Sequence, residues 1–179
     1  SFIRAWCVAI NAAGVFNIDG TNDYVSTNTL SFSAIENLTG GNMGDTINIS
    51  VNHTGDLTGD PAGGTNDGAD SFVFTGTATL DGNVDGGVFD GAGGGAAVST
   101  DTIDFSGSTL VLRVTNTGVG TDNGLTGTIQ DEPTSVDPPD TDLISGTFDN
   151  INSLVGNNLG QLLGPDADTF YNITGLNSG

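Results

Sequence analysis

A short motif led by aspartate recurs four times along the chain and constrains its fold more than any other feature. Each copy contains aspartate, then Thr or Ser, then a large apolar residue, with a second apolar residue close behind. The copies begin at Asp45, Asp70, Asp101 and Asp168. Apolar side chains that alternate with polar ones are typical of β-strands with one buried face. The motif therefore predicts a series of equivalent strands, each preceded by an aspartate in a turn.

A second pattern occurs twice, from Phe32 to Gly40 and from Phe148 to Gly156. An aspartate-led copy follows each occurrence, so the order of the motifs is preserved. We interpret the chain as one long repeat followed by the start of the next. In this interpretation the aspartate is a turn residue, because its carboxylate accepts hydrogen bonds from backbone N–H groups close in sequence.

Turn signals separate the short apolar runs. Asp-Gly or Asn-Gly pairs begin at Asp19, Asp67, Asp81, Asp85, Asp90 and Asn123, and the chain has 29 glycines. Short strands between such turns are typical of a β-solenoid, in which equivalent strands pair along one axis. We therefore expect an all-β parallel β-helix with long Gly/Asp-rich loops. Its predicted core ladder comprises Ile35, Leu38, Ile47, Ile49, Phe72, Phe74, Ile103, Phe105, Leu112, Phe148, Ile151 and Phe170.

The alternative fold is an antiparallel β-sandwich, as in a pilin-like or surface-layer filament subunit. The two folds differ in their strand neighbours, because sandwiches pair antiparallel strands.

Two ranges differ from the repeats. Residues 1–20 form an apolar N-terminal segment, and residues 21–179 form the expected solenoid domain, with a Pro/Asp-rich loop at 130–143. The N-terminal segment is apolar on both faces of any strand, which predicts burial on both sides. One interpretation is a first strand of the core; because a solenoid has open ends, the other is that this segment covers an end or edge of a second copy. The expected self-association residues are Phe2, Ile3, Trp6, Val8 and Ile10.

The charge balance excludes several classes of partner. Lysine is absent, Arg4 and Arg113 are the only arginines, and the formal net charge is −20. Two cations cannot neutralise a row of phosphates, so we expect no nucleic-acid partner. No run approaches the roughly 18 apolar residues of a membrane-spanning helix, so we expect no membrane insertion.

Calcium is the cofactor that the composition favours. It prefers six to eight oxygen ligands, and aspartates beside glycine offer both carboxylates and accessible carbonyls. His53 and Cys7 are the only residues of their kinds, which is too few for a closed zinc site. The candidate calcium ligands are Asp56, Asp60, Asp67 and Asp70; Asp81, Asp85 and Asp90; and Asp137, Asp140 and Asp142.

A resemblance to a known family rests on the stretches FSAIENLTGGNMGDTINI, DGADSFVFTGTATLDGNVDGG and STDTIDFSG. They resemble repeats of very large secreted bacterial adhesins, both filamentous-haemagglutinin-like proteins and calcium-binding-repeat proteins. The resemblance implies a parallel β-helix at the cell surface with a structural or adhesive function. It also implies self-association, as a homopolymer or in tandem repeats, with cell-surface glycans as a further partner.

An enzymatic function is the less favoured class. A β-helical polysaccharide-degrading enzyme would place several close carboxylates beside a basic residue, and only Arg113 stands in a strand-like run. Phosphate-binding loops and serine nucleophile motifs are absent from the sequence. We therefore expect a protein without catalytic residues.

Overall fold

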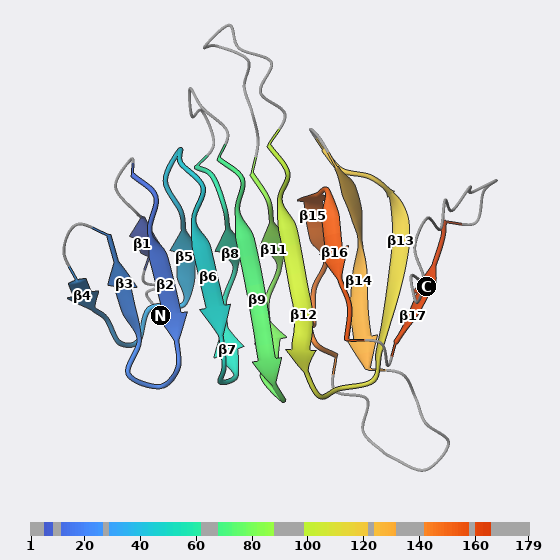
Figure 1. The fold of residues 1–179 in the computed structure, drawn as a ribbon, viewed down its shortest axis with the longest axis horizontal. Coiled ribbons are helices and arrows are strands. Elements are labelled where there is room, and N and C mark those ends of the chain that lie inside the picture. The colour runs from blue at the N-terminus through green and yellow to red at the C-terminus, as the bar shows by residue number, and fades with distance from the viewer. Residues whose placement is uncertain are drawn as a thin grey trace, which may run out of the picture.

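The computed structural model describes residues 6–8, 12–26, 29–61, 68–87, 99–121, 124–131, 142–157 and 160–165, with backbone alone for 6–8. Within these ranges the chain forms strands and no helix, which confirms the all-β prediction (Figure 1). The strands are β1 (Trp6–Val8), β2 (Val15–Ile18), β3 (Asp23–Val25), β4 (Thr29–Ser31), β5 (Asn37–Thr39), β6 (Thr46–Ile49), β7 (His53–Thr54), β8 (Leu57–Thr58), β9 (Ser71–Gly76), β10 (Leu80–Asp81), β11 (Val84–Asp85), β12 (Thr102–Ser108), β13 (Leu112–Val119), β14 (Leu125–Asp131), β15 (Phe148–Ile151), β16 (Ser153–Val155) and β17 (Gln161–Leu163).

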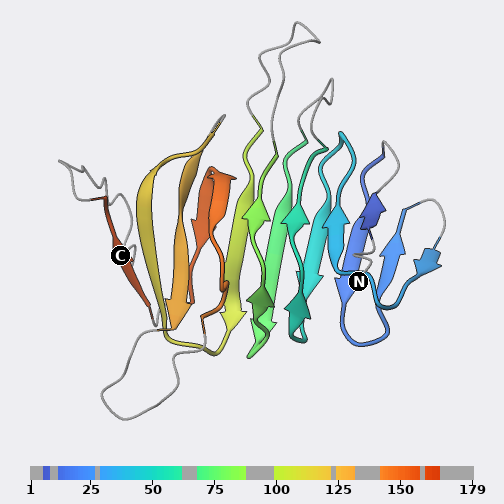
Figure 2. The same cartoon turned by 180° about the vertical axis from the view of Figure 1, so that it is seen from behind.

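Two large mixed sheets form two layers, seen from opposite sides in Figures 1 and 2. The first sheet has the order β1-β5-β8-β11-β15-β14-β13-β17, and the second has the order β16-β12-β9-β6-β2-β3-β4. Strands β7 and β10 form a third, small sheet. From β5 to β12 the chain visits the first, second and third sheets in turn, so successive strands of one sheet come from successive passes of the chain.

The central strands pair in parallel with a common register. Ile47 of β6 lies beside Phe72 of β9, which lies beside Ile103 of β12. In the first sheet, Leu57 of β8 lies between Leu38 of β5 and Val84 of β11. Equivalent side chains therefore form columns along the sheets, with neighbouring strands about 4.8 Å apart.

The columns that face the interior are apolar and fully buried. Phe16, Ile47, Phe72 and Ile103 form one column, and Ile18, Ile49 and Phe74 form the next, all at most 1 % exposed. Alternation places Thr, Ser and Asn of the same strands on the outer face, where Asn48 Nδ2 donates a hydrogen bond to Asn17 Oδ1 at 2.9 Å. Burial of the apolar columns is the main favourable contribution to folding.

Antiparallel strands lie at both ends of the sheets. At one end β2, β3 and β4 form a meander, whose first turn contains Gly20 at a φ of 95°. Toward the other end the hairpin β13–β14 is inserted between β12 and β15, with Gly124 at a φ of 84° in its turn. Both turns coincide with Asp-Gly or Asn-Gly pairs of the sequence, where glycine accepts positive φ without cost.

The register corrects the interpretation of one long repeat. Phe148 lies beside Val84, in the column of Leu38, and not in a position equivalent to Phe32. Leu154 lies beside Ile103 in the second sheet, although the repeated pattern matched it to Leu38 of the first. A short apolar pattern fits either sheet, so its recurrence did not determine which strand it forms.

The predicted core ladder is buried at every described position except one. Ile35 is only partly buried and packs against the core. Phe170 lies outside the described residues. The Pro/Asp-rich loop predicted at 130–143 lies mostly outside the described residues, and of its two borders Asp131 belongs to β14 and Leu143 is buried.

Candidate functional site

Three of the four aspartate-led motifs stack directly on one another where the chain passes from the first sheet to the second. Each carboxylate oxygen Oδ1 accepts the backbone N–H at the same position one pass earlier. Gly14 N donates to Asp45 and Asp45 N donates to Asp70, both at 2.6 Å. Asp70 N donates to Asp101, and Asp101 N donates to Asn152, both at 2.9 Å. We call these three aspartates, with Asn152 at their end, the aspartate column.

The hydrogen bonds of the column correct the role predicted for its aspartates. We expected each carboxylate to bind N–H groups close in sequence. Instead, the backbone donors to the Oδ1 atoms of the three aspartates are 25 to 31 residues away, while Gly41 N donates to Asp45 Oδ2 at 2.6 Å and Ser99 Oγ donates to Asp101 Oδ2 at 3.1 Å from nearby in sequence. The aspartates therefore connect consecutive passes of the chain, because each carboxylate accepts a backbone N–H of the preceding pass.

A column of glycines gives the aspartates their space. Gly40, Gly59 and Gly86 each follow a strand of the first sheet and lie opposite the carboxylate of the same pass. A Cβ at Gly40 would stand 2.6 Å from Asp45 Oδ2, and one at Gly59 would overlap Asp70 Oδ2. Such a Cβ would also meet the carbonyl of the next pass, so a side chain here displaces backbone as well as carboxylate.

The column is buried and strongly acidic. Asp45, Asp70 and Asp101 are each 2 % exposed, as is Asp60, which lies near Asp70. Loss of hydration, and then repulsion from the carboxylates of Asp60, Asp101 and Asp45, raises the pKa of Asp70 to about 9 against a backbone hydrogen bond that lowers it. Burial also raises the pKa of Asp45, opposed by its hydrogen bonds from Gly41 and Gly14.

A second polar column runs along the opposite end of the strands of the first sheet. Asn37 Oδ1 accepts from Asp56 N, and Asp56 Oδ1 accepts from Asn83 N, both at 2.9 Å. Asn83 Oδ1 accepts in turn from Thr147 N at 3.0 Å. This Asn/Asp column uses the same kind of hydrogen bond as the aspartate column, but its oxygens accept from the following pass rather than the preceding one, and most of it is open to solvent.

An acidic surface groove of about 390 Å³ lies over the outer face of the first sheet. Its carboxylates belong to Asp56, Asp85 and Asp149, with hydroxyls from Thr58 and Thr147 between them. Asp85 Oδ1 already accepts from Gly87 N and Asn150 Nδ2 at 3.0 and 2.9 Å. Arg113 lies in β13 and is not among the residues that line the groove.

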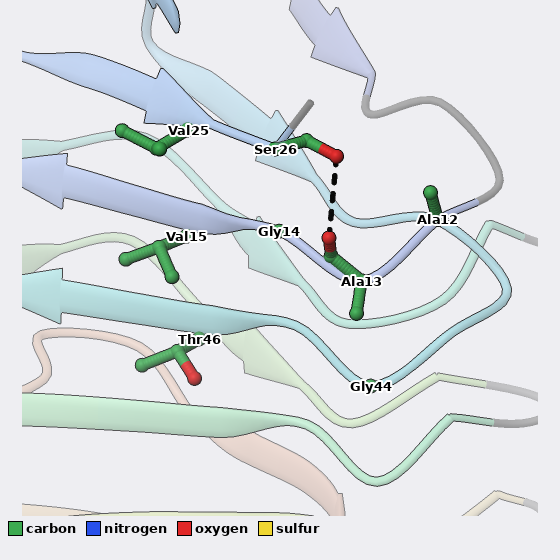
Figure 3. Close-up of a pocket in the computed structure, with 8 residues that line it drawn as sticks. All are labelled: Ala12, Ala13, Gly14, Val15, Val25, Ser26, Gly44 and Thr46. Carbon is green, nitrogen blue, oxygen red and sulfur yellow. Dashed lines mark hydrogen bonds between the residues drawn. The ribbon is translucent and has the colours of Figure 1, made fainter. Parts of the chain in front are cut away.

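A second hollow, of about 550 Å³, lies where β2 and β6 begin and β3 ends (Figure 3). Its lining is formed by small or neutral side chains, and Ser26 Oγ donates to Ala13 O at 3.3 Å across it. The lining residues are Ala12, Ala13, Gly14, Val15, Val25, Ser26, Gly44 and Thr46. None of them titrates near neutral pH, so the hollow offers no acid–base group.

The predicted calcium ligands are distributed over several places. Asp60 and Asp70 come together at the aspartate column, Asp56 and Asp85 share the acidic groove, and Asp81 is exposed and accepts from Ser145 Oγ at 2.8 Å. Within the described ranges no three acidic, His or Cys side chains are grouped as metal ligands. Asp142 is half-buried near the end of the loop at 130–143. Asp67, Asp90, Asp137 and Asp140 lie outside the described residues.

The predicted self-association residues lie mostly outside the described ranges. Trp6 and Val8 belong to β1, whose backbone pairs in parallel with Asn37 and Thr39 of β5. Phe2, Ile3 and Ile10 are not described. Strand β1 is the outermost strand of the first sheet, so within the described part of the chain one of its edges is unpaired.

Sequence reasoning missed the glycine column and Asn152. A signal for the glycines was present: an apolar residue, Thr or Asp, then Gly recurs at Leu38–Gly40, Leu57–Gly59 and Val84–Gly86. Each triplet precedes an aspartate-led copy, at distances that vary because loops of different length are inserted.

Comparisons with known proteins give no relative: no family model, curated protein or solved structure matches the chain. In the portion of the chain described here, no helix could span a membrane.

Proposed function

We propose that this protein is a structural or adhesive element of the bacterial cell surface, built as a parallel β-helix that self-associates through its ends. The observation that carries the proposal is the common parallel register from β6 to β16, with one pass of the chain stacked on the next. Such stacking supports a β-helix over an antiparallel sandwich, whose neighbouring strands run in opposite directions. It also supports the proposed resemblance to adhesin repeats.

The ends of the sheets support self-association. Strands β1, β16 and β17 each have one neighbour in the described part of the chain, which leaves a row of backbone N–H and C=O groups for another strand. Val155 of β16 is 40 % exposed, and Leu162 and Leu163 of β17 are 55 % and 41 % exposed. Strand addition by a second copy, or by a further repeat of the same polypeptide, would pair these edges and bury these side chains.

The surface supports an extracellular location and a mechanical function. A net charge of −20, with two arginines and no lysine, disfavours nucleic acid as a partner. The acidic groove offers carboxylates and hydroxyls to calcium or to cell-surface glycans, which we propose as secondary ligands. We propose no catalytic function.

Electron microscopy and sedimentation velocity test the proposal. We expect the purified chain to form fibres or end-to-end oligomers, and Leu162→Asp to shift it toward monomers. Val119→Asp is the matched control, because Val119 is 79 % exposed but lies at the tip of the β13–β14 hairpin. A chain that stays monomeric at all concentrations, or that responds equally to both substitutions, would contradict self-association through the ends.

Deletion of residues 1–10 tests the other end. We expect assembly to be lost while the circular dichroism of β-structure is retained, because β1 contributes only one edge strand. Unchanged assembly would remove the N-terminal segment from the proposed contact.

A further inference from the structure

Asp70 occupies the middle of the aspartate column, and every charge that acts on it comes from another carboxylate. Asp45 precedes it by one strand, Asp101 follows it by one strand, and Asp60 lies at the end of β8. Its Oδ1 atom accepts from Asp45 N, whereas its buried Oδ2 atom has no hydrogen-bond partner. The site therefore has an acidic group whose second oxygen is neither hydrated nor satisfied.

Carboxylates stacked this closely cannot all be ionised away from water. Each negative charge loses hydration on burial and is repelled by its neighbours. A proton on one of them removes both costs and also converts a carboxylate oxygen from an acceptor into a donor. The raised pKa values of Asp70 and Asp45 follow from this arrangement.

We propose that the aspartate column retains a proton at neutral pH, held by Asp70 together with its neighbouring aspartates. Protonation of the column at lower pH stabilises the stacked strands. The device is distinct from the proposed self-association, since it acts within one copy of the chain. In this account the protein unfolds more readily as the solution becomes alkaline.

The sign follows from proton linkage. An unfolded aspartate releases its proton near pH 3.8, whereas the folded column retains it up to about pH 9. The folded state therefore binds more protons between these values, and the free energy of unfolding falls as pH rises through this window. The contribution is complete below the unfolded pKa and lost above the folded one. One proton would raise the unfolding constant by at most about ten-fold per pH unit.

The column itself contains the neutral equivalent of a protonated aspartate. Asn152 stands in register after Asp101, and its Oδ1 accepts Asp101 N in the geometry that the aspartates use. An uncharged amide therefore performs the hydrogen bonding of this position without a titrating group.

Urea unfolding at pH 5 and pH 8, with EDTA present, tests the proposal on wild type, Asp70→Asn and Asp81→Asn. Asp70→Asn keeps the acceptor oxygen, so we expect it to fold, to lose most of the decrease in unfolding midpoint between the two pH values, and to exceed wild type at pH 8. Asp81→Asn removes an exposed carboxylate and should retain the wild-type decrease. A wild-type midpoint that is unchanged or higher at pH 8, or an equal decrease in all three proteins, would overturn the proposal.

Two further measurements remain informative if Asp70→Asn fails to fold. The side-chain carboxyl carbon signals of the wild type should include one from the column that titrates above pH 7; titration of all of them below pH 5 would overturn the proposal. Calcium is the other means of neutralising the column. If calcium chloride at pH 8 restores the pH 5 midpoint in wild type and not in Asp70→Asn, the column is a cation site and the proton proposal is wrong.

Discussion

The two polar columns use the same hydrogen bond in opposite surroundings. In both, a side-chain oxygen of one pass accepts the backbone N–H of its neighbour, at 2.6 to 3.0 Å. Asp45, Asp70 and Asp101 are buried, whereas the column of Asp56 and Asn83 reaches solvent. The same hydrogen bond therefore forms whether the accepting side chain is charged or neutral. Its contribution to the free energy of unfolding, and the dependence of that contribution on pH, are set by burial.

Loss of space in the buried column should have the largest effect. Gly59→Ala places a Cβ against both Asp70 Oδ2 and the carbonyl of Gly86. We expect a loss of about 3 kcal/mol or more in the free energy of unfolding, since backbone must move to relieve the overlap. Gly118→Ala, with nothing within 4 Å of the added carbon, is the control. Equal urea midpoints for the two variants would show that the glycine column does not pack against the aspartate column.

Removal of an acceptor should separate the two columns next. Asp101→Ala leaves the buried Asp70 N–H without its partner, which we expect to cost about 1–3 kcal/mol at pH 5. Asp56→Ala frees the N–H of Asn83, which water can reach, and should cost less than about 1 kcal/mol. Chemical denaturation measures both. A larger loss of unfolding free energy for Asp56→Ala than for Asp101→Ala would contradict the expectation that the buried column contributes more to stability.

Neutralisation of Asp45 should reveal the same pH response more weakly than neutralisation of Asp70. Burial raises the pKa of Asp45, so its charged form destabilises the folded state as pH rises above 3.8. Because Gly14 N and Gly41 N donate to the two oxygens of Asp45, Asp45→Asn loses one acceptor at every pH, and its thermal midpoint relative to wild type should be higher at pH 8 than at pH 4. A lower midpoint at pH 8 than at pH 4, relative to wild type, would contradict this sign.

The exposed turn at Asp19 should show the smallest effect and the opposite sign. Hydrogen bonds from Thr21 and Asn22 lower the pKa of Asp19, so its contribution is present above pH 3.8 and is lost as pH falls through the lowered value. Asp19→Asn should reduce the thermal midpoint slightly at pH 7, and the reduction should shrink as pH falls through the lowered pKa. A variant that becomes relatively more stable at pH 7 would contradict the role of this turn.

The sequence was sufficient to predict that three aspartate-led motifs stack. It was insufficient to predict which groups donate hydrogen bonds to their carboxylates. Alternation of Ile47 and Ile49 with polar residues identifies a strand, and recurrence at Phe72 and Ile103 identifies equivalent strands. The hydrogen-bond partners depend instead on which passes lie side by side. That order is set by loops and by the inserted β13–β14 hairpin, which carry no copy of the aspartate-led motif.

The candidate site was found only in part for the same reason. Asp60 and Asp70 were expected to lie together because they are close in sequence, and they do. Asp45 and Asp101, rather than Asp56, join them because of the register between strands. A group of residues chosen only because they are neighbours in the sequence carries no information about that register. The repeated pattern at Phe32 and Phe148 did not identify equivalent strands, because a short run of apolar residues fits the inner face of either sheet.

Hydrogen-bond couplings measured by NMR test the central claim, stacking in register, most directly. The account predicts that the amide of Ser71 is coupled to the carbonyl of Asp45 and the amide of Thr102 to the carbonyl of Asp70. Couplings from these amides to carbonyls of other strands, or rapid exchange of both amides with solvent, would contradict it.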